Sequence, residues 1–151
     1  MLATTHIAFA ILCGLLLLLV FPITDVPVFF TFLVIGSILP DVDHKGSIIN
    51  KLVPLTRWVP YLFKHRGVFH SLFPVALLSG VFYILRAPTI GIYLCIGYLS
   101  HLLSDAMTSL GVGLFYPLSK SRARGWIVVG TIQETAFFTL TIACILFYFF
   151  W

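Results

Sequence analysis

The sequence is poor in charged residues, and this shortage limits the class of protein. Only 9% of its 151 residues are charged, whereas 60% are hydrophobic, and the mean hydropathy is +1.10. A soluble domain carries roughly 25% charged residues. The composition therefore excludes an ordinary soluble domain and predicts a single integral-membrane domain over residues 1–151.

Cysteine is also scarce, with Cys13, Cys95 and Cys144 each inside an apolar run and none in a CxxC pair. We interpret them as packing residues and expect no disulfide framework. The first apolar run has no Lys or Arg before it and no small-residue cleavage site after it. It is therefore predicted to be a retained helix and not a signal peptide.

The apolar runs, interrupted by proline and charge, predict an all-α polytopic bundle of about five transmembrane helices. The expected spans cover residues 6–21, 28–39, 68–85, 89–108 and 134–150. The run 28–39 is short for a span of ~20 residues, so we expect it to be tilted or extended. Residues 45–66 mix Lys and Arg with aromatic side chains, which is typical of a loop or amphipathic segment in the headgroup layer.

The basic residues are distributed unequally between the two sides of such a bundle. With five spans, the N-terminus, residues 41–67 and residues 108–133 share one side, which carries every Lys and Arg except Arg86. The positive-inside rule makes this side cytoplasmic and the C-terminus external, in the cell (inner) membrane. The net charge of +4 is then explained by orientation, and no nucleic-acid partner is expected.

His101 and Asp105 are four residues apart and project from one face of the fourth span, where they can hold one metal ion. Ionisable residues at membrane depth are costly and mark a functional site by default. The predicted topology places seven further residues of metal-binding type at the same cytoplasmic helix ends: His6, Asp41, Asp43, His44, His65, His70 and Glu134. We therefore predict a metal centre with two divalent ions, zinc or manganese.

Four motifs follow one another in the chain: Thr5-His6, Leu39-Pro40-Asp41-Val42-Asp43-His44, His65-Arg66-Gly67-Val68-Phe69-His70-Ser71 and Gly97-Tyr98-Leu99-Ser100-His101-Leu102-Leu103-Ser104-Asp105. Their order resembles the YdjM-like family, described as LexA-regulated or membrane-bound metal-dependent hydrolases. That family is remotely similar to zinc-dependent phospholipase C and P1 nuclease. The zinc clusters of those enzymes use an HxxxD helix motif, which His101 and Asp105 match. The clusters also use an N-terminal amine and an HxxxE motif, but here Gly130 stands four residues before Glu134.

The resemblance implies hydrolysis of a phosphoester, and a site at the membrane boundary favours a lipid or lipid-linked substrate. We expect Asp41 or Asp43 to help a metal-activated water attack. Arg66 is expected to bind the phosphate through a bidentate pair.

Several alternatives stay open. The protein could bind or transport metal without chemistry, although the far side offers only Asp25 and Arg86. It could also be a structural membrane protein in which His and Asp side chains join helices. Asp43 or His44 could lie behind the ligands, and Glu134 could simply favour the first turn of its helix.

Overall fold

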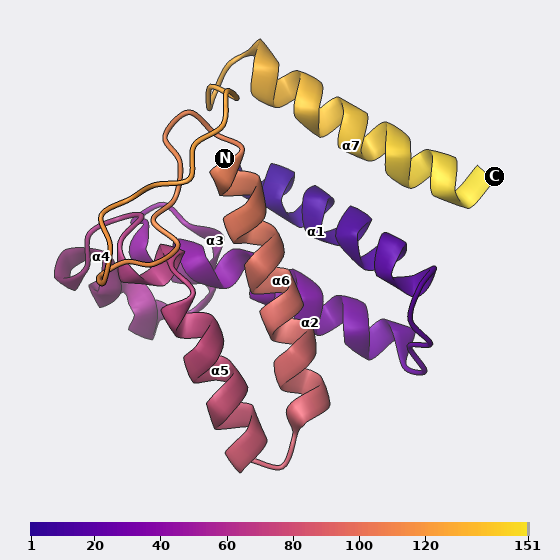
Figure 1. Ribbon diagram of the computed structural model, residues 1–151, viewed down its shortest axis with the longest axis horizontal. Coiled ribbons are helices and arrows are strands. Elements are labelled where there is room, and N and C mark those ends of the chain that lie inside the picture. Colours follow the sequence, from indigo (N-terminus) through magenta and orange to yellow (C-terminus); the bar gives the residue numbers. More distant parts are fainter. Residues whose placement is uncertain (151) are drawn as a thin grey trace.

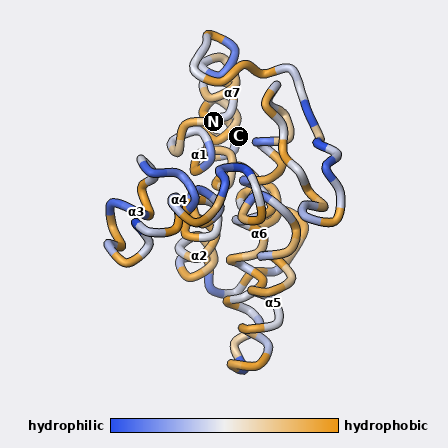
Figure 2. The backbone as a smooth tube through the Cα atoms, turned by 90° about the vertical axis from the view of Figure 1, so that its left-hand side faces the viewer, coloured by the Kyte–Doolittle hydropathy of each residue, from blue (hydrophilic) through white to orange (hydrophobic). Residues whose placement is uncertain are grey.

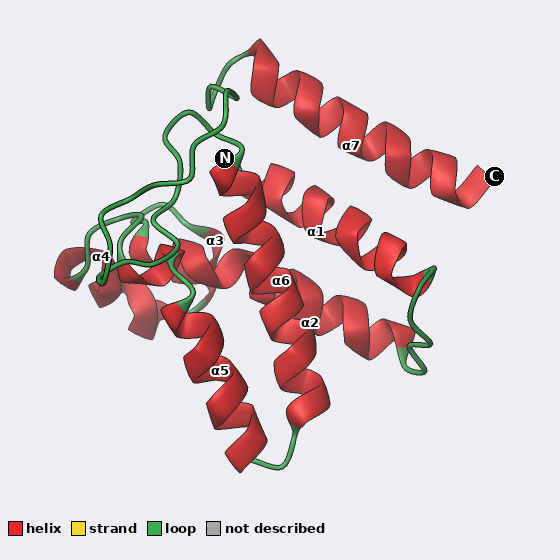
Figure 3. Cartoon of the chain, in the orientation of Figure 1, coloured by secondary structure: helices red, strands yellow, loops and turns green. Residues whose placement is uncertain are grey.

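The computed structural model describes residues 1–150, and within them the chain is all-helical (Figures 1 and 3). The α-helices are α1 (Ala3–Leu18), α2 (Val26–Ile38), α3 (Ile48–Leu52), α4 (Val59–Leu62), α5 (Phe73–Ile84), α6 (Pro88–Ala106) and α7 (Ile132–Phe150). Three 3₁₀ turns, η1 (Leu39–Asp43), η2 (Pro54–Trp58) and η3 (Val68–His70), connect them. No strand occurs in residues 1–150, where only isolated bridges tie the long loop between α6 and α7. The all-α prediction is confirmed.

Two helices are long and apolar enough to cross a membrane, judged by length and composition. They are Val26–Asp43, which joins α2 to η1, and α7. The apolar helices α1 and α5 are shorter, with 16 and 12 residues. The structure therefore supports two candidate spans and does not by itself establish the five that the sequence predicts.

The third predicted span begins later than expected. Residues 68–70 form η3, and α5 starts only at Phe73. Ser71 separates the two, because its hydroxyl donates to the Val68 carbonyl (2.7 Å) and accepts from the Phe73 amide (3.3 Å). Pro74 then occupies the first turn of α5, where its missing N–H costs nothing. The displaced segment carries His70 towards the bundle interior.

The long helices converge at one end of the molecule and diverge from it. In Figure 1, α1 and α7 run in the same direction, α2 returns beneath α1, and α5 and α6 form a hairpin that points downwards. The start of α1 and the ends of α2 and α6 meet at this end, which we call the convergent end. Figure 2 shows the hydrophilic stretches mainly around α3, α4 and the loop between α6 and α7, while the long helices are mostly hydrophobic.

The closest helix crossing joins α2 to α6 and depends on two glycines. A Cβ atom on Gly97 would lie 2.0 Å from the Leu33 carbonyl oxygen, and one on Gly36 would lie 2.2 Å from that of Leu94. Only glycine permits such backbone contact, as in other membrane helix pairs. The crossing brings the end of α2 against the last two turns of α6, which carry the predicted metal ligands.

Candidate metal centre

The structure brings together most of the predicted site residues. Two groups of side chains could each hold a metal ion, because their ligand atoms lie within 4.8 Å of one another. The first group is His6, His101 and Asp105, and the second is Asp41, His65 and His70. Six of the nine predicted ligands, from helix ends far apart in the chain, therefore lie close together.

The two groups meet in a central quartet, which consists of Asp41, His70, His101 and Asp105. Nε2 of His70 lies 3.3 Å from Nε2 of His101, 3.6 Å from Asp41 Oδ1 and 3.6 Å from Asp105 Oδ2. Nε2 of His101 lies 3.8 Å from each of the same two carboxylate oxygens. In a tetrahedral zinc site with bonds of about 2.0–2.1 Å, neighbouring ligand atoms are separated by about 3.3–3.4 Å. The central quartet is slightly wider than that and has the donor set of a zinc or manganese site.

The orientation of His101 is fixed by a backbone bond. Nδ1 of His101 lies 2.7 Å from the carbonyl oxygen of Ser37 at the end of α2. A carbonyl only accepts, so Nδ1 carries the proton and Nε2 presents its lone pair to the central quartet. The glycine crossing of α2 and α6 therefore selects the histidine tautomer that could bind a metal ion through Nε2.

His70 is oriented by carboxylates. Its Nδ1 lies 3.2 Å from Asp43 Oδ2, which leaves Nε2 to face His101. Burial of the ring lowers the pKa of His70, but the carboxylates of Asp41 and Asp43 beside it outweigh burial and raise the pKa to about 9. Two imidazole lone pairs facing each other repel, so a cation must separate these rings. A proton on His70 can fill this role, and so can a metal ion.

Asp43 is a supporting residue in this geometry. Its carboxylate accepts from His65 Nδ1 at 2.7 Å and from the Arg66 amide at 3.1 Å, in addition to facing His70. It is 2% exposed. The structure therefore places Asp43 behind the ligands, the alternative left open above, whereas Asp41 faces a cavity.

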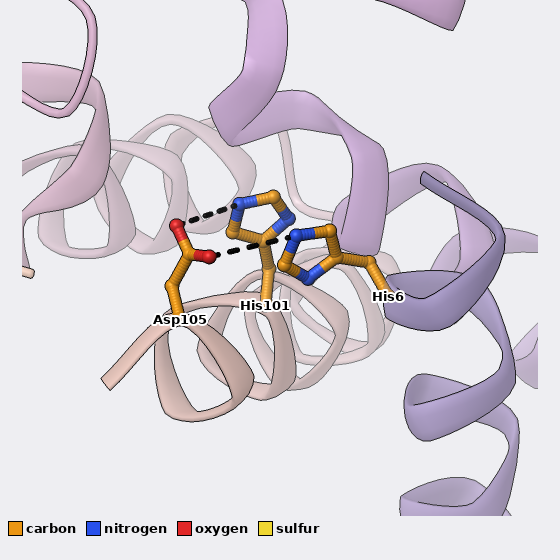
Figure 4. Close-up of side chains that lie close together, drawn as sticks. All are labelled: His6, His101 and Asp105. Carbon is orange, nitrogen blue, oxygen red and sulfur yellow. Dashed lines mark ion pairs between the residues drawn. The ribbon is translucent and has the colours of Figure 1, made fainter. Parts of the chain in front are cut away.

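His6 offers a second cation position on the other side of Asp105. Its Nδ1 lies 2.7 Å from the Ser104 hydroxyl, which already donates to the His101 carbonyl, so Nδ1 of His6 is the donor. No hydrogen-bond partner in the described chain reaches Nε2 of His6, although the ring is buried. This nitrogen lies 3.7 Å from Asp105 Oδ1, and the rings of His6 and His101 stack with centroids 3.7 Å apart (Figure 4). An orphaned buried acceptor beside a carboxylate fits a cation.

Arg66 occupies the remaining side of Asp105. Its Nη2 donates to Asp105 Oδ1 at 2.7 Å, while Nη1 donates to the Thr108 hydroxyl and the Gly111 carbonyl. The α-amino group of Met1 lies 3.2 Å from the same carboxylate oxygen. The two oxygens of Asp105 therefore serve different neighbours: Oδ2 faces the histidines of the central quartet, and Oδ1 faces cationic groups and His6.

Three predicted ligands lie outside the two candidate metal-binding groups found among the described residues: Asp43, His44 and Glu134. His44 is exposed, with its ring 5.1 Å from that of His65. Glu134 is buried and accepts from the Leu2 amide, the Thr5 hydroxyl and the Gly130 amide. These bonds attach the start of α7 to the start of α1. Glu134 also lies in the first turn of α7, the position that the alternative interpretation gives it.

A cavity of about 650 Å³ lies over the centre. Asp41, His65 and Arg66 are in its wall, so two of the candidate ligands, Asp41 and His65, are accessible from it. Lys51 and Arg122 add positive charge to the same wall. The cavity therefore suits an anionic ligand.

Sequence reasoning missed the residues that orient the ligands, above all Ser37 and Ser104. Ser37 acts through its backbone carbonyl, which any residue could supply, so its side chain gives no signal. The glycines at positions 36 and 97 were an available signal for the close crossing that places this carbonyl.

A family model described as the YdjM inner membrane protein matches residues 1–151. The chain belongs to the YdjM inner membrane protein family. The YdjM inner membrane protein of Escherichia coli strain K12 is 36% identical over 93 residues, which cover 56% of this chain and 46% of that protein. Bacillus subtilis strain 168 has an uncharacterized relative, YvsG, 34% identical over 88 residues, which cover 55% of this chain and 53% of YvsG.

This chain spans about half the length of the curated YdjM and YvsG relatives that it matches. No solved structure matches it. The YdjM family description supports the inner-membrane location that the composition predicts.

Proposed function

We propose that this chain is a metal-dependent hydrolase that cleaves a phosphoester of a lipid or lipid-linked substrate. The proposal depends on one observation above all. The central quartet has the donor atoms and spacing of a metal site, and Asp41 of that quartet faces a cavity with a basic wall. A phosphoester is the anion that such a combination of ligands and cations fits.

The residues present fit one ion in the central quartet and a second beside His6 and Asp105. A buried carboxylate such as that of Asp105 is costly unless it is paired or coordinates a metal. Asp105 and the partly exposed Asp41 face the same two imidazole nitrogens. When bound, zinc or manganese lowers the pKa of a coordinated water and polarises a phosphoryl oxygen.

The side chains would bind the phosphate, accept a proton and position the ligands. Arg66, Lys51 and Arg122 supply positive charge to the cavity that would receive the phosphate. Asp41 is 20% exposed, so it can hold an ion or accept a proton from water. Asp43 keeps His70 and His65 in position. Hydrolysis adds water across the P–O ester bond and yields an alcohol and a phosphate.

The membrane position supports a lipid substrate. We propose that five helices cross the inner membrane. The convergent end and the N-terminus would lie at the cytoplasmic face, and the C-terminus would lie outside. The basic residues near the centre support this orientation. A lipid headgroup at that depth would reach the cavity without leaving the bilayer.

The test combines metal content with lipid hydrolysis by the detergent-purified chain. The wild-type chain is reloaded with zinc or manganese, its metal is counted by mass spectrometry, and products from phospholipids with fluorescent acyl chains are separated. Asp41→Asn is expected to lose at least one ion and the activity. His44→Gln removes a histidine outside the two groups and is expected to keep both ions.

The outcomes separate the two parts of the proposal. A wild-type chain that binds no metal after reloading would overturn both the site and the activity. A chain that binds two ions but cleaves no lipid phosphoester would keep the metal centre and overturn the hydrolase assignment.

A further inference from the structure

A second positively charged site lies beside the metal centre, in the segment that connects α2 to η3. Residues 44–67 contain no Asp or Glu but five Lys and Arg: Lys45, Lys51, Arg57, Lys64 and Arg66. Three of these, Lys45, Lys51 and Arg57, line one cavity of about 310 Å³ together with Asn50 and Tyr61. The segment therefore concentrates positive charge in a defined hollow.

The cavity is built from neutral partners, which hold the cations without neutralising them. Arg57 Nε donates to the Asn50 carbonyl at 3.1 Å. Asn50 is buried, and its Nδ2 donates to the carbonyls of Val42 and His44. Lys45 Nζ lies 4.3 Å from the centre of the Tyr61 ring. No ion pair among the described residues involves Lys45 or Arg57, so their charges are available to an anion.

The same segment exposes large apolar side chains next to the cavity. Leu55 is 83% exposed, Trp58 72% and Leu62 76%. Leucine and tryptophan next to Lys and Arg are typical of segments that lie in the membrane interface. A freely diffusing anion needs no such apolar surface, whereas a phospholipid presents a phosphate and acyl chains together.

We propose that Lys45, Lys51 and Arg57 form a binding site for the phosphate of an anionic phospholipid headgroup, with Leu55 and Trp58 inserted beside its acyl chains. This site is separate from the metal centre and does not depend on the proposed hydrolysis. Lys51 lines both cavities, so the lipid site adjoins the metal cavity. The segment anchors the metal centre at the level of the lipid phosphates.

The test uses the fluorescence of Trp58 as the only tryptophan of the detergent-purified full chain, in a Trp126→Phe and Trp151→Phe background. It is titrated with monomeric dihexanoyl phosphatidylglycerol, dihexanoyl phosphatidylcholine and inorganic phosphate. The anionic lipid is expected to bind about 100-fold more tightly than the zwitterionic one, because each of the three cations strengthens binding to an anionic lipid about fivefold. Lys45→Gln and Arg57→Gln should each weaken phosphatidylglycerol binding about fivefold.

Lys120→Gln is the matched control, since it removes an exposed cation from the loop between α6 and α7 and should leave binding unchanged. Lys45 contacts the Tyr61 ring through a cation–π interaction and makes no structural hydrogen bond of the kind that Arg57 makes. Lys45→Gln therefore serves as the test if Arg57→Gln lowers the unfolding midpoint. Equal binding of the two lipids would overturn the proposal, as would wild-type binding by Lys45→Gln. Displacement of the lipid by millimolar inorganic phosphate would identify a free-phosphate site and overturn the lipid assignment.

Discussion

His101 donates a hydrogen bond from Nδ1 to the backbone carbonyl of Ser37, 2.7 Å away on the neighbouring helix. This bond links the geometry of a helix crossing to the chemistry of a metal ligand. It fixes both the ring plane and the tautomer, so Nε2 faces His70 without any rearrangement. A ligand that is oriented before the ion arrives loses little conformational entropy on binding.

Replacing His101 should therefore remove a preorganised ligand. We expect His101→Gln to weaken zinc binding by more than about 100-fold, beyond the range typical of residues behind the ligands. Competition with a chromophoric chelator measures this change. His44→Gln is the matched control and should bind zinc as the wild type does. Equal affinities of wild type and His101→Gln would contradict the assignment.

Asp43→Asn should have a milder effect, because Asp43 contacts histidines through their Nδ1 atoms. We expect zinc affinity to fall about 10–100-fold while the number of ions at saturation stays unchanged. The same chelator competition gives the affinity, and mass spectrometry gives the count. A lower count at saturating zinc would show that Asp43 is itself a ligand.

Gly97→Ala should destabilise the protein by about 1–3 kcal/mol, the usual cost of overpacking. The new Cβ would lie 2.0 Å from the Leu33 carbonyl oxygen, so α2 and α6 must separate. Gly80→Ala in α5 is the control. Nothing lies within 4 Å of its added Cβ, and a gain of about 0.4–1 kcal/mol is expected. Denaturant titration in mixed micelles compares the two, and a neutral Gly97→Ala would contradict the close crossing.

Zinc binding should release protons, because the pKa of His70 is raised to about 9 in the metal-free protein. Below pH 9 the ion must displace this proton, so the apparent affinity should rise about tenfold per pH unit for one displaced proton and level off above pH 9. Calorimetry in buffers of different ionisation enthalpy counts the protons. No release at pH 7 would mean that His70 is not a ligand.

The same pKa has a consequence for stability without metal. A raised folded-state pKa stabilises the protein fully below the ordinary histidine value of 6.5, and this contribution is lost as the pH rises through about 9. Denaturation of the metal-free chain at pH 6 and pH 9.5 should therefore show lower stability at the higher pH. His70→Gln should reduce that difference.

Glu134→Gln tests whether this buried carboxylate binds metal or joins helices. Its two oxygens accept from the Leu2 and Gly130 amides and the Thr5 hydroxyl. Replacing one oxygen by a donor should cost about 1–3 kcal/mol of stability. Zinc affinity should stay within about twofold of the wild type if the carboxylate only joins helices. Loss of an ion would restore Glu134 to the ligand set.

The sequence predicts residues that the structure places close together, whereas the five spans stay a prediction. Helix ends alternate between two sides, so counting apolar runs was enough to bring His6, Asp41, His70 and His101 together. The lengths of the helices were harder to predict, because hydropathy does not reveal that residues 68–70 form a separate turn before α5. The Ser71 hydroxyl that separates them acts through local backbone bonds.

Residue type and spacing predict which residues belong to the proposed site, but they do not predict the role of each residue. Asp41 and Asp43 are equivalent in the sequence, yet one faces a cavity and the other is surrounded by His65, His70 and the Arg66 amide. The 3₁₀ geometry of η1 directs the two side chains differently. Residue type and spacing alone contain no information on that direction.

The two oxygens of the Asp105 carboxylate share one negative charge, so a cation on Oδ2 and a cation on Oδ1 compete for it. A cation held on Oδ2 by the histidines draws electron density away from Oδ1 and weakens the hold of that oxygen on the Arg66 guanidinium. A cation in the central quartet would therefore weaken the ion pair between Asp105 and Arg66, which lies in the wall of the cavity.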